Sequence, residues 1–162
     1  MTLPEAEPLR REVQDAFARR PYPGDDAIAR RRPGCAGDEA EKVWQRYRGK
    51  DWKQMVAVGR QQNLRDDLGF LTFAGFVYYL PAFLELSLDA DRRFDLDESV
   101  VSYLWSFPEQ VATLLDPGEK RAVVQVLEFL AGEFEKRRYV QNNARAALDH
   151  YWAYFTDEEL GQ

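Results

Sequence analysis

Residues 72–88 read TFAGFVYYLPAFLELSL, and this stretch decides the fold because it is the most apolar part of the chain. Thr72 suits an N-cap position, where its hydroxyl can accept a hydrogen bond from the first helical turn. The helix predicted over residues 73–88 is apolar nearly all round, which is typical of a buried central helix. Pro81 lies inside this helix and should kink it, because proline leaves the carbonyl of Val77 without its helical donor.

Further out on both sides, apolar residues recur at helical spacing behind capping signals. The strongest signal is Asp116-Pro117-Gly118-Glu119, a capping box with proline in the first turn. The stripe from Val140 to Phe155 predicts a last helix of about four turns, and no stretch alternates as a strand would. We therefore predict an all-α fold: a single-domain helical bundle of six to eight helices around the Pro-kinked central helix. This domain covers residues 1–162, with an irregular loop at about residues 21–37.

The composition supports one globular core, with 45% hydrophobic and 14% aromatic residues among 162. Cys35 and His150 are the only residues of their types, so they can form neither an internal disulfide nor a zinc site of cysteine and histidine ligands. No nucleophile elbow, phosphate loop or dinucleotide-binding motif occurs. Glu85 and Asp89 lie one turn apart and could pair their carboxylates, although a solvated helix face is the favoured interpretation. We predict no catalytic residue, no metal and no cofactor, and favour a protein that is not an enzyme.

The net charge is −6 and is unevenly distributed. Residues 1–50 hold 11 Lys+Arg against 9 Asp+Glu, whereas residues 51–162 hold 11 against 19. Because an acidic body repels phosphate, we expect no nucleic-acid partner. The apolar stretch is interrupted by Pro81 and Glu85, so we expect no membrane span. The first residues show no basic start followed by an apolar run, and together with the single cysteine this favours a cytoplasmic protein.

A candidate interaction surface lies in and beside the irregular loop. It comprises Tyr22, Pro23, Arg30, Arg31, Arg32 and Trp52. The flanking prolines would hold Tyr22 on a stiff backbone, where a tyrosine ring can anchor a partner. The three arginines could steer an acidic partner or a second copy of this acidic protein. The simpler interpretation, which the pattern favours, is that the prolines only end the first helix, Tyr22 packs on the core and the arginines are solvated.

A second candidate site is a pocket beside the predicted kink. Tyr78 and Tyr79 point about 100° apart on a helix, so at least one hydroxyl needs a polar partner. The Val77 carbonyl freed by Pro81 is one such partner. A pocket formed by Tyr78, Tyr79 and Pro81 would suit a small-molecule-binding protein or an enzyme.

Three short motifs give the chain a family resemblance. They are Pro-Tyr-Pro-Gly at residues 21–24, Gly-Lys-Asp-Trp at residues 49–52 and Tyr-Tyr-Leu-Pro-Ala at residues 78–82. In these motifs, the last of which is the most specific, the chain resembles a family of bacterial domains of unknown function. The resemblance implies a shared fold but no activity, so it assigns no site residue.

Together these observations favour a non-catalytic helical protein-interaction module of the adaptor, regulatory or immunity-like kind. Its partner would be an unknown protein or a second copy of the chain. The alternative is a small-molecule-binding protein or an enzyme that uses the pocket beside Tyr78, Tyr79 and Pro81.

Overall fold

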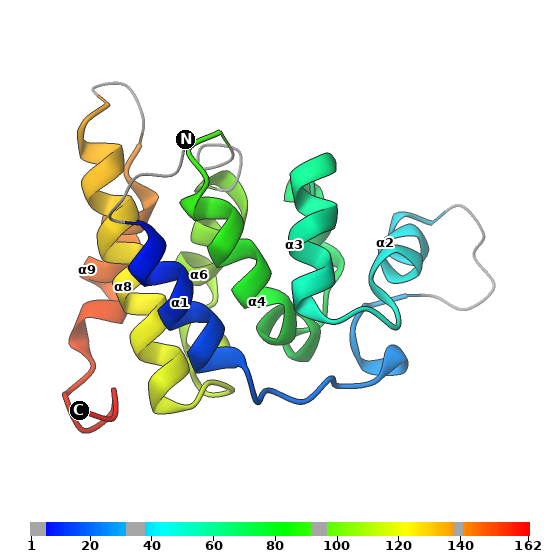
Figure 1. The fold of residues 1–162 in the computed structure, drawn as a ribbon, viewed down its shortest axis with the longest axis horizontal. Helices are drawn as coiled ribbons and strands as arrows, with labels where there is room; N and C mark the ends of the chain where they lie inside the picture. Colours follow the sequence, from blue (N-terminus) through cyan, green and yellow to red (C-terminus); the bar gives the residue numbers. More distant parts are fainter. Residues whose placement is uncertain (1–5, 32–37, 92–96, 138–140) are drawn as a thin grey trace.

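The computed structural model describes residues 6–31, 38–91, 97–137 and 141–162. Its α-helices are α1 (Ala6–Phe17), α2 (Glu39–Tyr47), α3 (Trp52–Gln61), α4 (Phe73–Leu88), α6 (Ser102–Ser106), α7 (Pro108–Ala112), α8 (Pro117–Glu135) and α9 (Asn143–His150). Shorter 3₁₀- or π-helical turns are η1 (Asp25–Ala27), η2 (Arg65–Phe70), η3 (Asp97–Val101) and η4 (Trp152–Tyr154). The described residues thus hold eight α-helices and no strand beyond an isolated bridge, which confirms the predicted all-α bundle (Figure 1).

Helix α4 lies at the centre of the bundle (Figure 1). Every residue from Gly75 to Leu88 is buried, as a helix without a polar face requires. The helix begins where predicted, because the Thr72 side chain accepts a hydrogen bond from the Gly75 N–H at 2.9 Å, and it continues through Pro81. Helices α1, α3 and α8 each pack against it. Within the described residues, neither α4 nor any other helix combines the length and apolar composition needed to cross a membrane.

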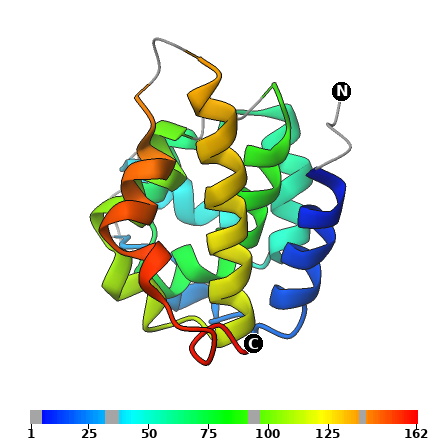
Figure 2. The ribbon, with the colours of Figure 1, turned by 90° about the vertical axis from the view of Figure 1, so that its left-hand side faces the viewer.

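Helix α8 packs against α1, α4 and α9 (Figure 2). Its start is the predicted capping box: the Glu119 N–H donates to the Asp116 carboxylate at 2.8 Å, and the Asp116 N–H donates to the Glu119 carboxylate at 3.0 Å. Pro117 occupies the first turn, where its missing N–H leaves no bond unmade. The residues that specify this start are therefore local in sequence.

Helix α9 is shorter than the predicted last helix. It ends at His150, and the chain turns at Tyr151, with φ −152°, into η4. The side chain of Trp152 is fully buried, and its indole N–H donates to the Leu104 carbonyl at 3.0 Å. This tertiary hydrogen bond, rather than the helical stripe, determines where the helix ends. Val140, at the other end of the predicted stripe, lies outside the described residues.

The chain that follows α1 crosses the lower edge of the molecule in Figure 1 to reach α2 and α3. The described part of the predicted loop contains η1 and an isolated antiparallel bridge between Ala29 and Leu71. The bridge ties this segment to the residues just before α4. Residues 32–37, which include Arg32, lie outside the described residues.

Two glycines permit close approach to α4. A Cβ atom at Gly75 would lie 2.1 Å from the carbonyl oxygen of Ile28, so that backbone crosses the first turn of α4 where only glycine fits. A Cβ atom at Gly59, in α3, would lie 2.3 Å from a methyl carbon of Leu86. The Ile28 segment and α3 can therefore each contact α4 closely, because a glycine lies at each contact.

We expect Gly75→Ala to destabilise the protein by about 1–3 kcal/mol, because the added methyl group must displace the Ile28 backbone. Gly132→Ala, in α8, is the matched control: a Cβ there meets nothing within 4 Å. The better helix propensity of alanine should then stabilise that variant by about 1 kcal/mol. Urea unfolding followed by circular dichroism measures both changes. If the two variants change stability alike, the Ile28 segment does not hold this position.

Candidate functional site

The three sequence motifs meet at one place, which we call the motif corner and define as Tyr22, Asp25, Gly49, Tyr78 and Tyr79. Tyr22 donates its hydroxyl hydrogen to Asp25 and accepts a hydrogen bond from the Gly49 N–H at 3.0 Å. The Tyr22 hydrogen bond lowers the pKa of the Asp25 carboxyl group. The rings of Tyr22 and Tyr78 pack edge to face, with centroids 5.3 Å apart. The segment after α1 is thereby fastened to the α2–α3 turn and to α4.

Tyr79 is fully buried in the motif corner, and burial raises the pKa of its hydroxyl. That hydroxyl lies 2.8 Å from the carbonyl oxygen of Tyr47 and 2.7 Å from that of Lys50, so its single hydrogen is shared between two acceptors. The sequence suggested the Val77 carbonyl as a partner. The structure instead provides carbonyls from the end of α2 and the turn that follows it.

The predicted pocket residues lie inside the packed fold. Tyr78 is 5% exposed, and Pro81 is buried. The two grooves described below are lined by other residues. A pocket beside Tyr78, Tyr79 and Pro81 therefore stays a prediction.

The residues of the predicted interaction surface differ in their solvent exposure. Trp52 is 4% exposed and belongs to the core, while Pro23 is half-buried. The guanidinium of Arg31 lies 3.7 Å from the ring centroid of Trp44 and 3.8 Å from the Glu41 carboxylate. Arg31 is therefore held by its own neighbours, whereas Arg30, the residue before it, is exposed.

Arg30 forms part of an open cluster that we call the aromatic–arginine face, defined as Arg30, Phe73, Tyr103 and Phe107. The guanidinium carbon of Arg30 lies 5.7 Å from the centroid of the Phe73 ring. Phe73 contacts Phe107 at 5.7 Å and Tyr103 at 6.1 Å, and Tyr103 contacts Phe107 at 5.0 Å between centroids. Phe107 is 40% exposed. The face thus brings together the segment before α2, the start of α4 and the α6–α7 region.

A groove of about 370 Å³ adjoins this face, between η2 and the η3–α6 segment. It is lined by Arg65, Asp66, Leu68, Gly69, Ser99, Ser102, Tyr103, Ser106 and Phe107. Tyr103 and Phe107 belong to both the groove and the face. At the other end, the Arg65 guanidinium lies 3.5 Å from the Asp66 carboxylate, so the charges there largely balance.

A second groove, of about 460 Å³, lies between α1 and α8. Its polar lining combines the carboxylates of Glu12 and Asp15 with the guanidinium of Arg121 and the amide of Gln125. Arg121 also donates to the backbone carbonyl of Leu160 at 3.2 Å. The groove therefore has mixed charge.

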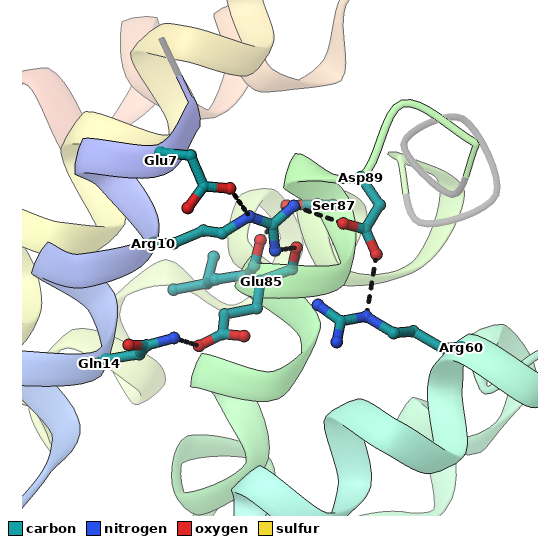
Figure 3. A network of polar contacts seen from close by, with 8 residues as sticks. Glu7, Arg10, Gln14, Arg60, Glu85, Ser87 and Asp89 are labelled. Carbon is teal, nitrogen blue, oxygen red and sulfur yellow. Dashed lines mark hydrogen bonds and ion pairs between the residues drawn. The ribbon is translucent and has the colours of Figure 1, made fainter. Parts of the chain in front are cut away.

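Figure 3 shows a polar network that joins α1, α3 and α4. Arg10, 6% exposed, donates to the backbone carbonyl of Glu85 at 3.1 Å and pairs with the Asp89 carboxylate. Gln14 donates to the Glu85 carboxylate at 2.8 Å, and Arg60 lies 3.5 Å from Asp89. The interpretation of Glu85 and Asp89 as a solvated helix face is wrong, because Glu85 is only 5% exposed. These carboxylates connect helices.

Two further buried acids are also partnered. Glu119 accepts two hydrogen bonds from Arg20, at 2.5 and 2.7 Å. Asp67 accepts from the Tyr47 hydroxyl at 2.9 Å and from Arg46 at 2.5 Å. Among the described residues, no three His, Cys, Asp or Glu side chains gather as metal ligands would. The buried acids thus serve as links between elements.

Sequence reasoning did not select Tyr103 and Phe107, although both lie in the aromatic–arginine face. The available signal was a pair of aromatic residues four positions apart, which share one side of a helix. That signal says nothing about exposure. Their contacts with Phe73 and the proximity to Arg30 depend on the tertiary fold.

Burial and the carboxylate of Asp67 raise the pKa of Tyr47 well above its ordinary value of 10.0. The folded state therefore favours the neutral phenol, and this contribution to stability is complete below pH 10. Above about pH 10 only the unfolded chain ionises there, so the free energy of unfolding should fall by about 1.4 kcal/mol per pH unit from this residue. Tyr47→Phe should remove this contribution to the pH dependence of the free energy of unfolding. Urea unfolding at a series of pH values between about 9 and 11 measures that dependence.

The control for this prediction is Tyr154→Phe, because Tyr154 is 73% exposed and should leave the alkaline slope unchanged. A wild-type slope in Tyr47→Phe would contradict the assigned environment of Tyr47.

Comparison with known proteins adds one relationship. No curated protein and no solved structure matches the chain. A family of unknown function, DUF6714, matches residues 34–156. The matched range includes the motifs at residues 49–52 and 78–82 and begins after the motif at residues 21–24. Because the match covers most of the sequence, the chain belongs to the DUF6714 family, whose function is unknown.

Proposed function

We propose that this protein is a non-catalytic helical module that acts by binding another protein. The observation that carries the proposal is the aromatic–arginine face, where Phe107 is 40% exposed on an aromatic cluster beside Arg30. Aromatic residues and arginine are enriched at protein interfaces and supply most of their binding energy. Covering an exposed aromatic cluster also removes apolar surface from water, which favours association.

Arg30 is the member of the predicted interaction surface best suited to meet a partner. Arg31 already lies against Trp44, Trp52 is in the core, and the Tyr22 hydroxyl is engaged in the motif corner. Arg30 is exposed and makes no ion pair within the described residues. Its guanidinium therefore remains available to a carboxylate of another protein.

The alternative of an enzyme or small-molecule-binding protein has weaker support. The Tyr79 hydroxyl donates to backbone carbonyls, and the Glu85 carboxylate is held by Gln14. Groups engaged in this way hold the fold together, and a reaction would have to break those contacts. We therefore favour the binding function.

The proposal also covers the class of partner and the cellular compartment. The acidic balance of residues 51–162 disfavours nucleic acid as the partner. A chain with a single cysteine suits a reducing compartment, and we propose that the protein acts in the cytoplasm.

The test is affinity purification from native host extract with the wild type and Phe107→Ser as baits. We expect Phe107→Ser to weaken capture of the specific partner by about tenfold or more, because a central aromatic anchor contributes about 2 kcal/mol or more to binding. Tyr154→Ser is the matched control, since Tyr154 is also exposed and makes no ring contact with the aromatic–arginine face among the described residues. It should capture the partner as the wild type does.

Thermal unfolding of each bait shows whether it is folded. If folded Phe107→Ser captures the same proteins as the wild type, the face is not the binding surface. If no protein is specifically captured by any bait, the binding function itself is contradicted.

A further inference from the structure

The electrostatics of the aromatic–arginine face are asymmetric. At one end Arg30 presents a cation without an ion pair among the described residues. At the other end of the adjoining groove, Arg65 and Asp66 lie 3.5 Å apart and offset each other. Among the described residues, the charge on this face that lacks an ion partner is therefore the positive charge of Arg30.

The apolar part of the face lies directly beside this charge. The Arg30 guanidinium is 5.7 Å from the Phe73 ring, and the Phe73 ring is 5.7 Å from the more exposed ring of Phe107. Side chains on the same side of an extended chain, two residues apart, are separated by about 6.4–6.8 Å. This spacing lets one extended segment reach Arg30 with one side chain and the aromatic rings with the next on that side.

The groove continues this surface in the direction of η2. Ser106 also lines the groove, and a serine hydroxyl can donate to or accept from the peptide groups of a bound chain. A volume of about 370 Å³ alongside the exposed ring of Phe107 suits a short length of extended chain.

We propose that the aromatic–arginine face and its groove bind an extended segment of a partner protein with the pattern acidic–any–apolar. The acidic side chain pairs with Arg30, and the apolar side chain two positions away covers Phe73 and Phe107. This inference rests on the proposed function and specifies its partner by chemistry. Charge complementarity selects the acidic residue, because arginine binds carboxylate through paired N–H donors. The exposed ring of Phe107 selects the apolar side chain of the bound segment.

A selection with a random nonapeptide library displayed on phage, using the full chain as the target, tests the pattern. We expect enriched peptides to carry Asp or Glu two positions from Phe, Tyr, Trp or Leu. Synthetic versions of these peptides are then titrated into wild type and variants by fluorescence polarisation. Arg30→Glu should weaken binding by about tenfold or more, and Phe107→Ser should do the same. Added salt should weaken wild-type binding, because the charged contact lies at the surface.

Arg48→Glu is the matched charge control. Arg48 is exposed and lies 4.9 Å from the ring of Trp44, so it resembles Arg30 in setting without belonging to the face. Its substitution should leave peptide affinity within about twofold of the wild type, as expected for a charge outside the interface. Thermal unfolding confirms that each variant is folded.

The inference is overturned if no peptides are enriched, if the enriched peptides lack the acidic–any–apolar pattern, or if Arg30→Glu binds them as the wild type does. Concentration-dependent dimerisation through Phe107 in sedimentation experiments would also overturn it, because the occupant would then be a second copy. Failure of this inference can be distinguished from failure of the proposed function. If Phe107→Ser loses the cellular partner while Arg30→Glu retains it, binding through the face stands and only the acidic pattern is wrong.

Discussion

The fold depends on the complete burial of α4. A helix that is apolar on every side cannot rest on the surface, so the remaining chain must enclose it. Helices α1, α3 and α8 do this directly. Close packing is possible because Gly75 accepts the Ile28 backbone and Gly59 accepts the Leu86 side chain, and any larger residue would push these neighbours away. The wrapping of a single central helix therefore explains why segments distant in sequence converge.

Enclosing α4 also places polar groups where water cannot reach them. Glu85 and Tyr79 are the clearest cases, and each finds a partner on an enclosing element: Gln14 of α1 for Glu85, and carbonyls of Tyr47 and Lys50 for Tyr79. A buried polar group without a partner costs more than the bond itself contributes. We interpret these contacts as constraints on position, because a shift of α1 or of the α2–α3 turn would leave a buried group unpaired.

The elements that sequence predicted correctly are those whose information is local. The start of α4 follows from the Thr72 cap, and the start of α8 from the Asp116 capping box. The predictions that failed are those that depend on tertiary contacts. The last helix ends early because the Trp152 indole bonds to Leu104, 48 positions away, and the solvated interpretation of Glu85 failed because its partners come from α1. Adjacent arginines differ for the same reason, since only the fold puts Arg31 over Trp44 and leaves Arg30 exposed.

The aromatic–arginine face combines residues inside and outside the family match, and this separates the proposed binding from stability. Its aromatic members lie within the family match at residues 34–156, whereas Arg30 precedes it. Phe73 begins the buried helix, and Tyr103 stacks on the core residue Phe76 at 4.1 Å, so changes there disturb packing. Arg30 contributes an exposed side chain, and its backbone N–H, which donates to the Phe70 carbonyl at 2.9 Å, is kept by any residue except proline. The charge of the face can therefore change without cost to the core, so substitutions at Arg30 test the proposed binding while the enclosure of α4 is unchanged.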